Sequence, residues 1–139
     1  MFKYLRTENC STHPTEIVSL FFEAGDEAYH EIPEGTVFST ITGELEDQYN
    51  PSTAIFLALT GKKRNEAAYV KCLPILPNMI FEASISKGED INFFVNGAVC
   101  DVLPDENGKG SSVTTNEGAE FVIIDASSRG KGFVTIRKL

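Results

Sequence analysis

The chain of 139 residues has no tryptophan, three cysteines and two histidines, and these shortages argue against several kinds of site. Cys10, Cys72 and Cys100 are an odd number and none stands in a Cys-x-x-Cys pair, which disfavours both a disulfide framework and a zinc site. His13 and His30 lack the spacings of a metal-binding pair, and two histidines give little support for a His-based catalytic triad. The composition therefore predicts no metal and no cofactor.

Long hydrophobic runs are also missing. No stretch reaches the roughly 18 consecutive apolar residues that a membrane-spanning helix needs. The start, MFKYLRTENCSTHP, has basic residues at Lys3 and Arg6 but no apolar segment after them, unlike a secretory signal. We therefore expect a protein that is intracellular when made and has no membrane partner.

Positive charge is scarce in the first half of the chain. Residues 7–61 contain no Lys or Arg but ten acidic residues, and the whole chain carries a formal net charge of −8. Binding to nucleic acid relies on clustered Lys and Arg, so we expect no nucleic acid partner. The basic residues gather later, at Lys62-Lys63-Arg64 and between Arg129 and Lys138. This asymmetry could orient the protein on a partner or on copies of itself, or it could be ordinary solvated surface.

What the sequence does contain is a series of strand-length apolar segments separated by turn signals, with no helical periodicity over any long window. The predicted strands are Ile17–Phe22, Ala28–Ile32, Thr36–Ile41, Ala54–Leu59, Ala67–Leu73, Met79–Ile85, Ile91–Phe94, Ala98–Leu103, Glu120–Asp125 and Gly132–Arg137. Because strands and links are short, we expect a mainly β fold, with residues 16–139 forming a single small antiparallel β-barrel or β-sandwich domain. Residues 1–15 are polar and predict an extended N-terminal arm that orders only against another molecule.

Two connections have clear turn chemistry. In YVKCLPILPNMIFEASI, residues 69–85, Pro74 and Pro77 each remove a backbone donor and fix φ, so the segment predicts a strand, a rigid corner and a second strand. Asp105–Gly108 predicts a tight hairpin through its Asn-Gly pair.

The aromatic residues are mainly phenylalanines, ten in all, and two of them form the pair Phe21-Phe22 in a predicted strand. Neighbouring side chains in a strand point to opposite faces, so one member of such a pair faces outwards and could mark an interface. The same reasoning applies to Phe93-Phe94.

Catalytic patterns are incomplete. Thr60-Gly61-Lys62-Lys63 resembles the end of a phosphate-binding loop, but GxxxxGK[ST] requires glycine where Phe56 stands and Ser or Thr where Lys63 stands. One alternative is a small hydrolase that uses clustered acidic residues, with Glu34 or Glu44 as a catalytic carboxylate. We nevertheless expect that the protein is not an enzyme.

Several segments share their order of strands and turns with a known family. They are Ile32–Val37, Ala54–Gly61, Tyr69–Ala83, Asn96–Val102, Ser112–Thr115, Glu120–Asp125 and Gly132–Arg137. This order resembles the head decoration proteins of tailed bacteriophages, also called capsid cement or stabilisation proteins. The resemblance covers roughly residues 28–139.

The resemblance implies a structural virion protein. Such proteins bind the outside of an expanded capsid at the junctions between capsomers, often as trimers. The resemblance therefore implies the major capsid protein as partner and a possible homotrimer. It also implies synthesis in the host cytoplasm and a final location on the outer surface of the capsid. Contacts repeated over the lattice would then add up. The residues that we expect to contact the capsid are Phe2, Lys3, Tyr4, Arg6, Lys62, Lys63 and Arg64.

An alternative from a different class is a carbohydrate- or peptide-binding β-domain of a fibre or surface protein. A domain of this kind would bind through exposed tyrosines such as Tyr29, Tyr49 or Tyr69.

Overall fold

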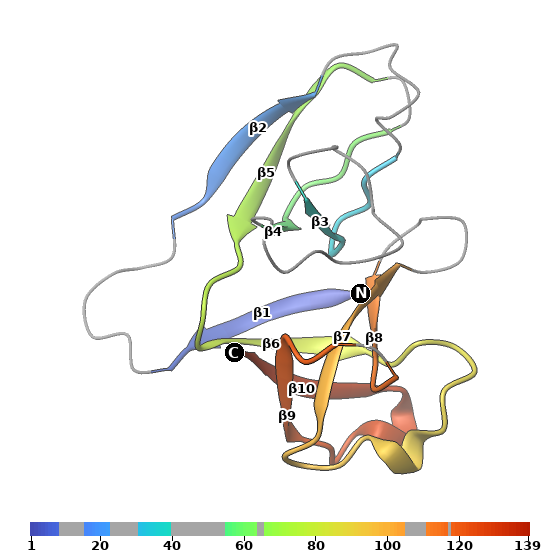
Figure 1. Cartoon of the computed structure of the whole chain (residues 1–139). Helices are drawn as coiled ribbons and strands as arrows, with labels where there is room; N and C mark the ends of the chain where they lie inside the picture. Colours follow the sequence, from blue (N-terminus) through green and yellow to red (C-terminus); the bar gives the residue numbers. More distant parts are fainter. Residues whose placement is uncertain (9–15, 23–30, 40–54, 64–65, 105–110, 117) are drawn as a thin grey trace.

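The computed structural model describes residues 1–8, 16–22, 31–39, 55–63, 66–104, 111–116 and 118–139. Within these residues, ten strands form two antiparallel sheets that pack as a sandwich (Figure 1). The predicted mainly β fold is therefore confirmed. Of the two architectures that the sequence left open, the sandwich is the one observed, since neither sheet closes into a barrel within the described segments.

The larger sheet has six strands and is rolled. Its order is β1 (Phe2–Thr7), β6 (Met79–Ser84), β10 (Phe133–Lys138), β9 (Phe121–Asp125), β7 (Val99–Pro104) and β8 (Ser111–Thr114). An isolated parallel bridge joins Ile85 to Val113, and the Ser86 N–H donates to the Val113 carbonyl over 3.0 Å. The β8 edge therefore curls back towards the segment that follows β6.

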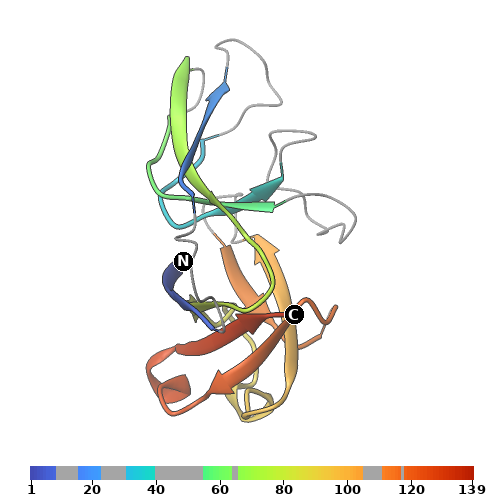
Figure 2. The same cartoon turned by 90° about the vertical axis from the view of Figure 1, so that its left-hand side faces the viewer.

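The smaller sheet has four strands in the order β2 (Val18–Phe22), β5 (Ala68–Pro74), β4 (Ile55–Ala58) and β3 (Val37–Ser39). All four lie between β1 and β6 in the sequence. Figures 1 and 2 show this sheet stacked on the larger one, with β1 running along the boundary between them.

The core has two parts because the smaller sheet contributes apolar side chains to two separate clusters, one on each of its faces. Leu57 and Leu73 from this sheet join Phe81 and Phe121 of the larger sheet in the main cluster. Their sequence neighbours point the other way and form a second cluster, whose members are Phe22, Ile32, Phe38, Ala58, Val70 and Cys72. Alternation along each strand thus supplies apolar side chains to both sides of one sheet.

The proline-flanked corner is confirmed, and it carries the chain from one sheet to the other. β5 ends at Pro74 in the smaller sheet and β6 begins at Met79 in the larger one. The turn is closed at Asn78, which has a φ of 70° and whose N–H donates to the Lys138 carbonyl over 2.9 Å. The Ile75 N–H donates to the Ile55 carbonyl over 3.0 Å, which ties the corner to β4.

The prediction of a free N-terminal arm is wrong for residues 2–7. These residues form β1, which pairs with β6 and brings Phe2 opposite Ala83. Phe2 is only 1% exposed because its ring lies in the main core, 6.0 Å from the Phe81 ring and 5.9 Å from the Phe121 ring. The alternation of Phe2 and Tyr4 with polar residues is what makes this segment a one-sided edge strand. Residues 9–15 of the predicted arm lie outside the described residues.

Eight of the ten predicted strands coincide with β2 to β7, β9 and β10 to within two residues. The predicted strand at Ile91–Phe94 is wrong: residues 91–93 form a 3-10 helix, η1 (Ile91–Phe93), because the Asp90 carboxylate caps it by accepting the Asn92 N–H over 3.0 Å. Most of the predicted strand at residues 28–32 is outside the described residues, and Ile32 forms an isolated bridge with Lys62. The predicted turn at Asp105–Gly108 is outside them too, while its flanking strands β7 and β8 pair antiparallel.

Candidate functional site

The predicted contact residues on β1 are divided between surface and core. Lys3 and Arg6 are exposed on this edge strand of the larger sheet. Tyr4 is half-buried, with its ring 5.9 Å from the Phe81 ring and its hydroxyl 2.6 Å from Thr7 Oγ1. Phe2 does not present its side chain at the surface, and it is a core residue rather than a contact residue.

The predicted basic segment is not a uniform patch. Lys62 is only 3% exposed, and its Nζ donates to the Lys63 carbonyl over 3.0 Å. Its backbone forms an isolated bridge with Ile32, which holds this lysine against the smaller sheet and away from solvent. Lys63 is exposed, and its backbone N–H donates to Glu66 Oε2 over 2.8 Å. Arg64 lies outside the described residues. Lys63 alone of these three is therefore shown as a surface cation.

Two exposed aromatic side chains lie side by side on the β2–β5 pair of the smaller sheet. Phe21 on β2 and Tyr69 on β5 are directly opposite each other, and their exposed fractions are 53% and 68%. The ring centroids are 5.0 Å apart with an interplanar angle of 50°. Ile17, immediately before β2, is exposed as well. We call Phe21 and Tyr69 the aromatic face.

The aromatic face follows from strand alternation. Phe22 points into the second core cluster, so Phe21 must point the opposite way, as the phenylalanine pair predicts. Ser19 and Lys71 are cross-strand partners on the same side of the sheet as Phe21 and Tyr69, and they give this surface polar neighbours. The second phenylalanine pair divides in the same way, with Phe93 exposed and Phe94 buried, although these residues belong to η1 and its cap rather than to a strand.

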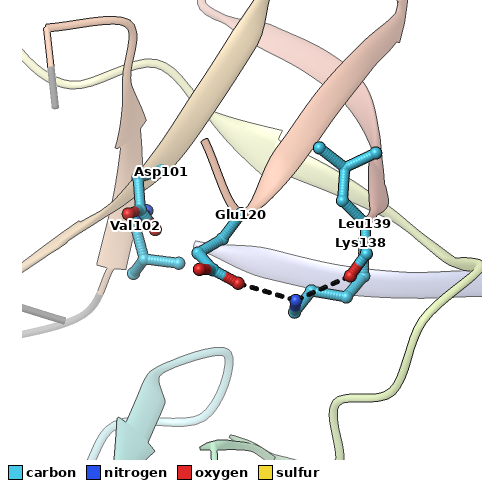
Figure 3. Close-up of polar contacts among 5 residues, drawn as sticks. All are labelled: Asp101, Val102, Glu120, Lys138 and Leu139. Carbon is cyan, nitrogen blue, oxygen red and sulfur yellow. Dashed lines mark hydrogen bonds and ion pairs between the residues drawn. The ribbon is translucent and has the colours of Figure 1, made fainter. Parts of the chain in front are cut away.

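A polar cluster lies at the end of the larger sheet where β10 finishes (Figure 3). Lys138 Nζ is 2.8 Å from Glu120 Oε2, donates to the Leu139 carbonyl over 2.8 Å, and lies 5.8 Å from the centre of the Phe121 ring. Nearby, the buried Asp101 carboxylate accepts the Val102 N–H over 2.7 Å. The lysine charge is neutralised by its partners, so this cluster stabilises the strand ends.

Several acidic residues of the described segments form hydrogen bonds or cap a turn of helix. Glu89 accepts the Asn116 side-chain amide over 2.9 Å and also contacts the Thr114 hydroxyl. Glu34, one of the two acids considered for a hydrolase, is exposed, and Glu44 lies outside the described residues. In the part of the chain that the structure describes, no three His, Cys, Asp or Glu side chains gather as a metal site.

The two described cysteines are buried free thiols. Burial raises the pKa of the Cys72 thiol to about 11. Burial, and secondarily the charge of Asp101, raise the pKa of the Cys100 thiol to about 12. Thiols of this kind remain protonated near neutral pH and are poor nucleophiles, so they act as small core residues.

Comparison with known proteins adds no relative: no family model, no curated protein and no solved structure matches this chain. Among the described residues, no helix has the length and apolar character needed to cross a bilayer. Among the described strands, the aromatic face has the most exposed large hydrophobic side chains, and it is the candidate site.

Proposed function

We propose that this chain is a structural virion protein that binds the outside of a phage capsid at capsomer junctions and stabilises the shell, with the major capsid protein as its partner. The observation that supports the proposal best is the aromatic face. Large aromatic side chains dominate the energetics of protein interfaces because each buries a large area at a small entropic cost. Phe21 and Tyr69 are more than half exposed although they stand on paired strands.

The scaffold behind the aromatic face suits a protein that bridges other subunits. β5, which carries Tyr69, is held between β2 and β4 and has a core cluster on the opposite face of the sheet. A contact surface on such strands is already ordered, so binding loses little conformational entropy. Lys71, on the same side of the sheet as Phe21 and Tyr69, and the exposed cations Lys3, Arg6 and Lys63 elsewhere on the surface would supply polar contacts to the shell. A moderate contact, repeated at every junction of a lattice, would raise the total cost of separating capsomers.

Binding to empty shells tests this proposal. Purified protein is mixed with expanded shells assembled from the major capsid protein encoded in the same genome, and occupancy is measured by co-sedimentation and by electron cryomicroscopy. We expect the protein to decorate the shells at capsomer junctions. We expect the double substitution Phe21→Ser and Tyr69→Ser to weaken binding by about 30-fold or more, because each removes a candidate interface anchor.

The matched control is Phe93→Ser, which removes a phenylalanine that is 63% exposed on a different element. We expect this variant to decorate the shells like the unmodified protein. Bare shells at saturating concentrations of the unmodified protein would refute the proposed function. Full decoration by the double variant would refute the role of the aromatic face.

A second candidate function is carbohydrate binding, and the exposure of Tyr69 favours it. Aromatic rings with polar neighbours can pack against sugar rings, and Ser19 and Lys71 lie on the same side of the sheet. Of the other tyrosines considered, Tyr29 and Tyr49 lie outside the described residues. Binding to a glycan array that is lost with Tyr69→Ala, together with bare shells in the sedimentation assay, would favour this function over the first.

A further inference from the structure

Among the described residues the two sheets have four edge strands, and three of them are protected against pairing with another strand. β1 has exposed charges at Lys3 and Arg6 and a register shift between Tyr4 and Arg6. β3 is short, with three described residues. The four residues of β8 are all buried. Charges, bulges, shortness and burial are the usual means by which an edge strand avoids adding a neighbour.

β2 has none of these protections. Its sequence, VSLFF, contains no charge and no proline, and it pairs with β5 in an uninterrupted register from Val18 to Phe22. Val18 to Phe21 make no backbone hydrogen bond to any described strand other than β5. Figure 1 shows β2 at the outer margin of the smaller sheet. One side of this strand therefore offers backbone donors and acceptors next to the exposed ring of Phe21.

We propose that β2 pairs with β2 of a second copy of this chain, antiparallel and across a two-fold axis, so that the two smaller sheets join into one continuous sheet. A two-fold interface uses the same surface on both copies and therefore has to be self-complementary. This inference goes beyond the proposed function and does not depend on it.

β2 meets the requirement of self-complementarity. In a register centred on Leu20, this residue faces Leu20 of the second copy, Val18 faces Phe22, and Ser19 faces Phe21. The first two pairings are apolar and lie on the face of the second core cluster, and the third lies on the face of Tyr69. Cross-strand pairs of this kind stabilise a sheet, and no like charges oppose each other.

Charge also favours a second copy at this strand. Two copies that each carry a net charge of −8 repel each other over most orientations. The repulsion between the two copies is smallest where neither presents a charge, and β2 is an uncharged strand of five residues. Because such a strand buries a small area, we expect a weak dimer whose population depends on concentration.

Sedimentation equilibrium of the full chain from about 1 μM to about 1 mM, a range suited to a weak interface, tests the proposal. We expect a monomer–dimer equilibrium in the unmodified protein. Ser19→Lys and Phe21→Lys each change an exposed side chain, so the fold should survive, and both place a charge on the pairing edge. We expect each to raise the dissociation constant by about tenfold or more, whereas Phe93→Lys, a matched exposed phenylalanine, should leave it unchanged.

A cross-link tests the register. In a Cys10→Ser background, Ser19→Cys and Phe21→Cys variants are mixed in equal amounts and oxidised. Directly opposite residues have the Cα spacing that a disulfide requires, so we expect the mixture to form a mixed dimer that neither variant forms efficiently alone.

Three outcomes would overturn the proposal: a monomer at every concentration, an oligomer that persists in both lysine variants, or no preference for the mixed disulfide. If Ser19→Lys, which leaves Phe21 and Tyr69 in place, loses shell binding while the unmodified protein is monomeric, the edge binds a strand of the shell protein, and self-pairing is refuted while the proposed function stands. If a dimer forms through β2 but shells stay bare, the proposed function alone is refuted.

Discussion

Replacing Phe2 with alanine measures how far the first residues belong to the core. The Phe2 side chain is almost fully buried, and its ring packs against the rings of Phe81 and Phe121. Phenylalanine-to-alanine substitutions in cores cost about 3–5 kcal/mol, and an edge strand can relax into part of the cavity, so we expect about 3 kcal/mol. At about 3–4 °C for each kcal/mol in a domain of this size, the melting temperature should fall by about 10 °C.

Scanning calorimetry and urea unfolding, followed by circular dichroism, measure this effect. Phe93→Ala is the matched control, because it removes an exposed phenylalanine, and we expect its free energy of unfolding to stay within about 0.5 kcal/mol of the unmodified protein. If Phe2→Ala changes stability no more than Phe93→Ala does, then β1 is not held in the core and residues 2–7 behave as the arm that the sequence predicts.

Three further substitutions or conditions test other parts of the fold. Glu120→Gln leaves the largely buried Lys138 without its carboxylate partner, and we expect the free energy of unfolding in urea to fall by about 1–3 kcal/mol. Glu8→Gln breaks the more exposed ion pair with Arg137 and should lower it by less than about 1 kcal/mol. Equal effects of the two substitutions would contradict this. Gly118→Ala should cost about 1–3 kcal/mol or more, because φ is +61° and the added Cβ would lie 1.9 Å from a carboxylate oxygen; an unchanged melting temperature would show that this turn is not held as described. Cys72 and Cys100 should resist alkylation at pH 8 until the protein is unfolded, as followed by peptide mass spectrometry. Because burial raises their pKa values to about 11 and about 12, the unfolded thiols lose protons first, so stability should fall as the pH rises above about 9; rapid alkylation of the folded protein would contradict this.

Local patterns predict much of the fold because they act over a few residues. The alternation of apolar and polar residues identifies β10, and the two prolines of residues 73–78 identify the corner between the sheets. β1 was missed because its evidence is non-local. Residues 1–15 are polar overall, the alternation of Phe2 and Tyr4 is too short to identify a strand, and Phe2 becomes a core residue only through pairing with Ala83, far along the chain.

The candidate site likewise depends partly on local patterns and partly on contacts between distant segments. The phenylalanine pair predicts that one of its members faces outwards, but only the register of β2 with β5 places Tyr69 opposite Phe21. The burial of Lys62 could not be read from a basic cluster, because it depends on the bridge to Ile32. Sequence therefore indicates which side chains alternate, whereas pairing between distant strands decides which of them meet.

The position of β10 determines when the larger sheet can be completed during synthesis. This strand is translated after all the others, yet it lies between β6 and β9 and hydrogen-bonds to both. The smaller sheet consists of an uninterrupted portion of the chain, so its strands can associate on a nascent polypeptide. β1 and β6 can pair with each other earlier, but the other edge of β6 has no neighbour until residue 138 has left the ribosome, and the apolar side chains of this incomplete sheet stay open to chaperones or to aggregation in the interval.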